Sequence, residues 1–203
     1  GEYVIPHFQR DFDWHPNMVA DLFESILHNR YAGTILLWNL ENIERELKMW
    51  DPLWGAEKGE KPTKAILDGQ QRLSSIYYAL GLPKKPFPNK TMYYYFYIDL
   101  DQLFSGNEDE SITYDYFKSP QKLEYFKKNK ERFIKENKFP ICLLSDKEFL
   151  DSEEYQDWLN KYVNYRKDLE LTALSVAKKI EGILNYNFLT ETLEKKEVKE
   201  ICT

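Results

Sequence analysis

The residues best suited to chemistry stand in one short stretch, Asp68-Gly69-Gln70-Gln71-Arg72. A guanidinium group matches the oxygens of a phosphate in bidentate fashion, and the two amide side chains add further donors. Apolar residues 65–67 precede the stretch and a helical pattern follows it, so we expect a buried strand that turns directly into a helix. The first turn of a helix has unpaired N–H groups and carries the positive end of the helix dipole. The stretch therefore predicts an anion site.

A simpler explanation is that these polar residues are solvated at the start of a helix. Helix caps are much commoner than ligand sites, but a strand-to-helix turn needs only a capping residue and a glycine. Three long donors in succession exceed that need. The spacing of Leu73, Ile76, Tyr77 and Leu80 predicts the apolar face of the helix, with Gly81 at its end.

A second pair of polar residues, Gln9 and Arg10, falls between two expected elements. Residues 3–6 are predicted to form a short strand that ends at proline. A helix is predicted to begin at Pro16, a residue type favoured in the first turn. Its apolar stripe consists of Met18, Val19, Leu22, Phe23, Ile26 and Leu27. The pair therefore lies on a loop held at both ends.

This loop also has a purely structural interpretation. Phe8, Phe12 and Trp14 would be core anchors, and Arg10 would form a surface ion pair with Asp11 or Asp13.

The composition is that of a folded chain with its own core. The 203 residues suffice for one domain, or for one domain with a helical appendage, and aromatic residues make up 16% of them. The net charge of −6 argues against a general nucleic-acid-coating surface, although a local basic face stays open.

The two cysteines indicate a reducing compartment. Cys142 and Cys202 show no paired CxxC spacing, which disfavours a disulfide scaffold or a zinc site. The longest apolar run, residues 93–98, is far too short to span a bilayer, and no signal peptide is visible. We therefore expect a cytoplasmic protein without a membrane anchor.

The remaining patterns predict alternating strands and helices. Strands are expected at residues 33–38 (a central strand), 92–98 (aromatic on both faces and hence covered on both), 139–144 and 187–193. Helices are expected at residues 121–138, 169–186 and 195–202. Another helix is expected to begin at Ser145, which forms a capping-box pattern with Glu148. A helical stripe is formed by Tyr155, Trp158, Leu159 and Tyr162. Residues 41–64 are interpreted as an irregular excursion and residues 107–115 as an acidic loop.

Two of these segments have an alternative function. Trp50 and Trp54 could stack on a base, but aromatic residues in loops more often pack back onto the core. The lysine-rich helix 121–138 could touch phosphate, although a solvated helix face is the commoner explanation.

Three ordered motifs carry a resemblance to a known family. They are Ile5-Pro6-x-Phe8-Gln9-Arg10-x-Phe12-x-Trp14, Tyr31-x-Gly33-Thr34-Ile35, and Leu67-Asp68-Gly69-Gln70-Gln71-Arg72-Leu73-Ser74-Ser75. Together they resemble the DGQQR-motif ParB-like N-terminal domain of GmrSD-type modification-dependent restriction proteins and of the related SspE-type phage-defence proteins. The likeness spans about the first 80 residues. Phe8 and Phe12 stand where that family usually has tyrosine, and Ser74-Ser75 where it usually has threonines.

The resemblance implies a fold and a division of the chain. The fold class is α/β (α+β), with a ParB/sulfiredoxin-like core and a mixed sheet, followed by a mainly helical C-terminal part. Residues 1–144 would form the nucleotide-binding domain. Residues 145–203 would be a helical extension that is truncated.

The resemblance also implies a nucleoside triphosphate as ligand, accompanied by Mg²⁺, and its hydrolysis. The nucleotide-binding residues would be Gln9, Arg10, Gly33, Thr34, Gly69, Gln70 and Arg72, and the catalytic residues Asp68, Gln70, Gln71 and Arg72. Because a carboxylate repels phosphate, Asp68 would hold Arg72 at i+4 or reach Mg²⁺ through water. Gln70 or Gln71 would orient an attacking water. No metal site built from protein ligands is expected.

The implied partners lie outside this chain. Restriction members of the family carry a separate HNH-type nuclease domain, whereas the three histidines here, His7, His15 and His28, all precede the DGQQR motif. Modified DNA would be met by the full-length protein or complex, and a homodimer is compatible with the aromatic helices near the C-terminus. The chain also lacks a GxxxxGK[ST] phosphate loop.

Other functions stay open beside that of a nucleotide-hydrolysing regulatory domain. One is a non-enzymatic module that binds nucleotide or DNA, and another is a ParB-like nuclease. A redox role is weaker, because neither cysteine adjoins the DGQQR motif.

Overall fold

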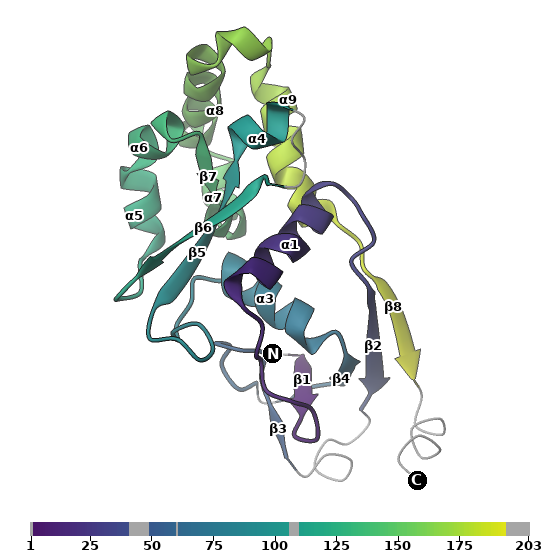
Figure 1. Ribbon diagram of the computed structural model, residues 1–203. Helices are drawn as coiled ribbons and strands as arrows, with labels where there is room; N and C mark the ends of the chain where they lie inside the picture. The colour runs from purple at the N-terminus through teal and green to yellow at the C-terminus, as the bar shows by residue number, and fades with distance from the viewer. Residues whose placement is uncertain (1, 41–48, 60, 106–109, 194–203) are drawn as a thin grey trace. The chain divides into compact units, whose positions relative to one another are not determined.

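The computed structural model describes residues 2–40, 49–59, 61–105 and 110–193 (Figure 1). The chain has a mixed α/β fold, as predicted. It divides into two compact units, each assembled from separate stretches of sequence. The first unit comprises residues 1–14, 32–78 and 187–203, and the second comprises residues 15–31 and 79–186. The division into 1–144 and 145–203 stays a prediction.

The first unit is built on a five-stranded mixed sheet in the order β3-β1-β4-β2-β8. Its strands are β1 (Tyr3–Pro6), β2 (Thr34–Asn39), β3 (Trp50–Asp51), β4 (Lys64–Asp68) and β8 (Leu189–Leu193). The pairs β1–β4 and β2–β8 are parallel, whereas β1–β3 and β2–β4 are antiparallel. The predicted strands at 3–6, 33–38 and 187–193 are confirmed, and β2 is an interior strand.

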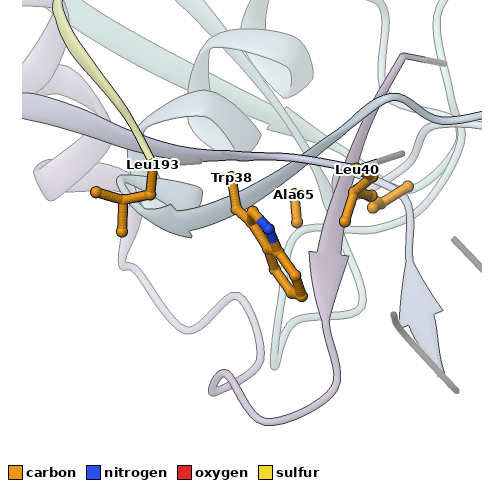
Figure 2. Packing of buried hydrophobic residues seen from close by; sticks show 5 residues of the cluster. Trp38, Leu40, Ala65 and Leu193 are labelled. Carbon is orange, nitrogen blue, oxygen red and sulfur yellow. The ribbon is translucent and has the colours of Figure 1, made fainter. Parts of the chain in front are cut away.

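Apolar clusters pack along this sheet. One contains Val4, Trp38, Leu40, Ala65 and Leu193, and four of these side chains are labelled in Figure 2. Trp50 is partly buried against this cluster, which favours the packing interpretation of that tryptophan over base stacking. A second cluster joins Ile35, Leu37 and Ile66 to Leu73 of the helix that follows β4. The sheet thereby fixes the start of that helix.

That helix is α3 (Gln70–Leu80), and its buried face differs from the predicted one. Ser74, Ser75 and Tyr78 are almost fully buried, whereas Tyr77, predicted to be apolar core, is 38% exposed. The Ser75 hydroxyl donates to the carbonyl oxygen of Gln71 at 2.8 Å. A small side chain whose hydroxyl is hydrogen-bonded to the backbone can be buried in close packing. The hydrophobic pattern therefore did not predict which face of α3 is buried.

The second unit contains a three-stranded antiparallel sheet in the order β6-β5-β7. Its strands are β5 (Tyr93–Asp99), β6 (Ile112–Phe117) and β7 (Lys138–Pro140). Its helices are α1 (Pro16–Leu27), α4 (Leu100–Ser105), α5 (Leu123–Lys128), α6 (Lys130–Lys135), α7 (Lys147–Leu150), α8 (Glu153–Tyr165) and α9 (Ala173–Glu181). The 3₁₀ segments are η1 (Ile141–Ser145), η2 (Lys167–Leu169) and η3 (Gly182–Asn185).

Strand β5 is the centre of this second core. On one face Tyr95 packs on Phe126 of α5 and Tyr97 on Phe133 of α6, with ring centroids 5.1 and 5.6 Å apart. On the other face Phe96 stacks on Phe23 of α1 at 6.5 Å. Helices therefore cover both faces along the part of β5 with these contacts, in agreement with the prediction.

The helical patterns were predicted with mixed success. The stripes of α1 and α8 are buried as expected, except that Met18 is 42% exposed. The expected helix 121–138 is two short helices separated at Asn129, and the expected strand 139–144 becomes 3₁₀ helix after Pro140. The expected helix 169–186 is η2, α9 and η3 in succession.

Some other sequence predictions need correction, and some concern residues outside the described ranges. Part of the expected acidic loop 107–115 is strand β6. Lysines of the 121–138 segment form ion pairs with carboxylates of the following helices, for example Lys130 with Asp157 at 3.2 Å, which favours the structural interpretation of its charge. The expected helix 195–202, and residues 41–48 and 60 of the expected excursion 41–64, lie outside the described residues.

The N-cap of α7 is Asp146, not the predicted Ser145, because the Asp146 carboxylate accepts from the Phe149 N–H at 3.0 Å. Lys127 Nζ lies 2.6 Å from the same carboxylate. The hydrogen bond from Lys127, followed by that from the Phe149 N–H, holds the pKa of Asp146 below its ordinary value.

This carboxylate predicts an acid-sensitive contribution to stability. A lowered folded-state pKa stabilises the fold above the unfolded-state pKa of about 3.9, and the contribution is lost as the pH falls through the folded-state value. Asp146→Asn keeps the cap but loses the ion pair, so we expect its free energy of unfolding to fall by about 0.5 kcal/mol at pH 7. When urea unfolding is measured between pH 7 and pH 2, the free energies of unfolding of wild type and Asp146→Asn should converge as the pH falls. Asp151→Asn, at an exposed position, is the control, and a constant gap at every pH would contradict the prediction.

Candidate functional site

The predicted strand-to-helix turn is present in the first unit. Strand β4 ends at Asp68 and α3 begins at Gln70. Gly69 joins them with φ +91°, a left-handed conformation that glycine adopts without strain. A Cβ atom at Gly69 would collide with the Ile35 side chain and lie 3.3 Å from Arg72 Nη2. The positive φ therefore favours glycine here, and a Cβ would in addition force the end of the Ile35 side chain to move.

Arg72 joins the second motif to the third. Its Nη2 lies 3.0 Å from a carboxylate oxygen of Asp68, the i, i+4 pair that the sequence suggested. Its Nη1 donates to the carbonyl oxygen of Ala32 at 3.0 Å. The guanidinium also rests on Gly33, which has φ +91°, and a Cβ there would lie 2.8 Å from Arg72 Cζ. With a side chain only 15% exposed, Arg72 is a fixed charge.

The loop of residues 7–14 is attached to β4 by Gln9. Its Nε2 donates to the carbonyl oxygens of both Ile66 and Leu67, each at 2.7 Å. These oxygens belong to the two residues of β4 that precede Asp68, its last residue. Gln9 therefore anchors the first motif directly beside the third.

Gln70 and Gln71 complete the attachment from the helix side. Gln70 Nε2 donates to the carbonyl oxygen of Arg10. Gln71 Nε2 donates to the carbonyl oxygen of Asp11 at 2.8 Å, and Gln71 Oε1 accepts from the Asp13 N–H at 3.1 Å. Both glutamines are at most 6% exposed. The first turn of α3 thus determines the path of the loop.

The sequence did not predict that Gln70 and Gln71 position the loop. It predicted instead that these glutamines bind the ligand or orient a water molecule. One signal was available: an amide side chain both donates and accepts, so it can pair with backbone groups of either kind. The burial that made this pairing necessary depends on the tertiary fold. Catalytic roles for Gln70 and Gln71 stay predictions.

Arg10 differs from Arg72 in its exposure. Its side chain is 69% exposed, and Nη1 lies 3.6 Å from a carboxylate oxygen of Asp13. One of the two ion pairs in the structural interpretation is therefore formed. An exposed pair of this kind contributes little to stability, so a stronger anion could displace Asp13.

The aromatic residues of the loop behave unequally. Phe12 is buried, with its ring 6.2 Å from that of Trp54. Phe8, predicted to be a core anchor, is 66% exposed. The loop is held by amide hydrogen bonds on either side of Arg10, so it does not need Phe8 as an anchor. The contact of Trp54 with Phe12 favours the packing interpretation of that tryptophan.

Thr34 begins β2, next to Gly33, and is partly buried in register with Leu189 of β8. The candidate site residues thus all belong to the first unit. The turn and its neighbours offer mainly donors: two guanidinium groups and the N–H groups of the first turn of α3. Asp68, with a side chain 70% exposed, is an acceptor at this turn, as is Asp13 beside Arg10.

Other kinds of site find little support in the described residues. Within them, no group of three or more His, Cys, Asp or Glu side chains could hold a metal ion. Cys142 is fully buried in the second unit, and burial raises the pKa of its thiol, which makes it a poor nucleophile. None of the described helices is long and apolar enough to cross a membrane.

Comparison with known proteins gives the family. The family described as "GmrSD restriction endonuclease, N-terminal domain" matches residues 1–201 of the chain. The chain belongs to this GmrSD family. The resemblance to the GmrSD-type N-terminal domain, seen in the first 80 or so residues, is therefore confirmed, and the family match extends over nearly the whole sequence.

One curated relative of this GmrSD domain is an uncharacterized protein of Methanocaldococcus jannaschii. It is 37% identical over 120 residues, which cover 55% of this chain and 20% of the relative. The chain thus spans about a fifth of the length of the curated relative it matches. As a member of the GmrSD family, the chain is an N-terminal module of restriction proteins.

Proposed function

We propose that this GmrSD domain binds a nucleoside triphosphate at the turn between β4 and α3 and hydrolyses it, and that DNA cleavage is performed by a separate HNH-type nuclease domain or subunit. The observation that carries the proposal is the seating of the Arg10 loop on the first turn of α3 by Gln9, Gln70 and Gln71. These contacts connect an exposed arginine to a helix N-terminus that already holds a second, fixed arginine. Each part alone is common, but their combination is suited to a polyphosphate.

The two arginines would have different tasks. Arg72 is held by Asp68 and by the Ala32 carbonyl oxygen, so it offers a preorganised charge at the helix N-terminus. Arg10 is exposed and pairs with Asp13 at 3.6 Å, so it can exchange that partner for phosphate oxygens. A bidentate guanidinium–phosphate contact is stronger than an exposed carboxylate pair.

The carboxylate at the turn is also suited to a nucleotide that carries Mg²⁺. Mg²⁺ in nucleotide sites keeps several waters and is held by the phosphates with one or two carboxylates. Asp68 is a carboxylate at the turn, and its 70% exposed side chain is open to water. When bound, Mg²⁺ would neutralise charge on the phosphate oxygens. The task of Asp68 would be to orient Arg72 and to meet the ion through water.

Calorimetry with ATP, GTP, CTP and UTP in the presence of Mg²⁺ tests the binding. For Arg10→Ala we expect the Kd to rise by about 10- to 100-fold, the usual worth of a charged hydrogen bond to phosphate. Arg10→Lys should recover part of the loss, because it restores the charge without the bidentate geometry. Lys61→Ala removes an exposed cation elsewhere in the first unit and should bind like wild type. Equal affinity of Arg10→Ala and wild type would contradict the proposed site.

A second candidate is a binding module without hydrolysis. It is favoured by one observation: the amide nitrogens of both glutamines donate to carbonyl oxygens of the loop backbone. Release of inorganic phosphate distinguishes the two candidates. Release that disappears in Arg10→Ala supports hydrolysis, whereas binding without release supports the module.

A further inference from the structure

An aromatic strip lies on one face of the three-stranded sheet in the second unit. We define the tyrosine strip as Tyr94 of β5 with Tyr114 and Tyr116 of β6. Tyr94 is in register with Tyr116, and its ring lies 5.6 Å from that of Tyr116 and 5.7 Å from that of Tyr114. The Tyr114 hydroxyl donates to Asn17 Oδ1, which fixes the orientation of its ring. The strip is therefore a continuous and ordered row.

Helix α1 contacts this face both at Tyr114, through Asn17, and at the end of the strands away from Tyr116. It contacts the sheet through Phe23, stacked on Phe96, and through Glu24, whose carboxylate accepts the Ile112 N–H. Tyr116 lies at the end of β6 away from Ile112 and is 62% exposed. An aromatic ring of that exposure, backed by a second ring, is available to stack on a flat partner.

Two lysines flank the exposed end of the tyrosine strip. Lys90 precedes β5 on a turn in which the Phe87 N–H donates to the Met92 carbonyl oxygen at 2.8 Å and the Phe87 ring lies 5.3 Å from that of Tyr94. Lys118 directly follows β6, whose Phe117 is in register with Tyr93 near the start of β5. Both lysines are exposed. They thus stand at the same end of the sheet as Tyr94 and Tyr116.

The carboxylate of β6 lies on the opposite face. Asp115 is in register with Tyr95, whose ring packs on α5, and it pairs with Lys138 at 3.7 Å. The exposed lysines Lys90 and Lys118 therefore adjoin the tyrosine strip, whereas the carboxylate of β6 is on the other face of the sheet. That local character contrasts with the net charge of −6 of the whole chain.

We infer that the tyrosine strip binds single-stranded DNA, with a base stacked on Tyr116 and the adjoining phosphates near Lys90 and Lys118. Exposed aromatic rings backed by cations are the recurring recognition surface for unpaired bases, because every base has a π-face. DNA is the nucleic acid to which a restriction-endonuclease domain is directed. The inference uses only second-unit residues and does not depend on the proposed nucleotide site.

Fluorescence anisotropy of labelled oligothymidylate, about 12 nucleotides long, tests the inference at low salt. For Tyr116→Ala we expect the Kd to rise by about tenfold, the usual worth of one stacked base. Tyr116→Phe, which keeps the ring, should bind like wild type. Tyr165→Ala is the matched control, since Tyr165 is a similarly exposed tyrosine (55%) on α8 of the same unit. Lys118→Ala should lower the slope of log K against log salt by about 0.7.

The outcomes separate clearly. Weaker binding in Tyr116→Ala, with wild-type binding in Tyr116→Phe and Tyr165→Ala and unchanged melting temperatures, supports the inference. Equal binding by Tyr116→Ala and wild type overturns it, as does an equal loss in Tyr165→Ala. Tighter binding of oligouridylate than of oligothymidylate would overturn the choice of DNA. A loss in Arg10→Ala but not in Tyr116→Ala would place the oligonucleotide at the nucleotide site and also overturn it.

Discussion

Replacing Gly33 with alanine is expected to lower the free energy of unfolding by about 3 kcal/mol and to abolish nucleotide binding. The new Cβ would occupy the space of the Arg72 guanidinium, 2.8 Å from Cζ, at a residue whose φ is +91°. Arg72 would have to leave the Ala32 carbonyl oxygen and Asp68. Urea unfolding gives the stability, and calorimetry with Mg²⁺ and nucleotide gives the affinity.

The chain offers a matched control for this substitution. Gly55 also has a positive φ, +82°, but a Cβ there would meet nothing within 4 Å. Gly55→Ala therefore has only the backbone strain of a left-handed residue, about 1 kcal/mol, and should bind nucleotide normally. If both variants lose the same stability, the contact between Gly33 and Arg72 is not responsible.

A double-mutant cycle isolates that contact further. In an Arg72→Ala background the space above Gly33 is empty, so Gly33→Ala should cost no more than Gly55→Ala does. Coupling of about 2 kcal/mol between positions 33 and 72 is expected, within the range found for residues in contact. Additive effects would show that the two residues act independently.

Replacing Gln71 with alanine should lower the free energy of unfolding by about 2–3 kcal/mol, because it leaves the Asp11 carbonyl oxygen and the Asp13 N–H without their partner. It should also weaken nucleotide binding by at least about tenfold, although we place Gln71 against the loop and not against the ligand. The reason is that the loop that presents Arg10 loses its attachment to α3. Urea unfolding and calorimetry measure the two effects.

The control for this variant is Gln121→Ala. Gln121 is partly buried in the second unit, and its side chain donates to the nearby Ser119 carbonyl oxygen at 3.1 Å. We expect its loss to change stability by less than about 0.5 kcal/mol. Normal nucleotide binding by Gln71→Ala, once its folded fraction is accounted for, would argue that the Arg10 loop does not form part of the site.

These two predictions show how much of the site was visible in the sequence. The strand, the turn at Gly69 and the helix start at Gln70 follow from local pattern, because apolar runs and glycine act over a few residues. The pairing of Asp68 with Arg72 follows from helical spacing. The family itself was accessible from three short motifs.

Tertiary structure alone decided what those residues touch. Gln9, Gln70 and Gln71 hold backbone groups about 60 positions away in the sequence, and Gly33 is required because Arg72 lies over it. The buried face of α3 likewise uses serines, which no hydrophobic pattern marks. Local sequence determines which elements form, since backbone conformation depends on neighbouring residues. The partner of a buried amide depends on which distant backbone groups the packed sheet brings within hydrogen-bond reach, and only the folded chain determines that.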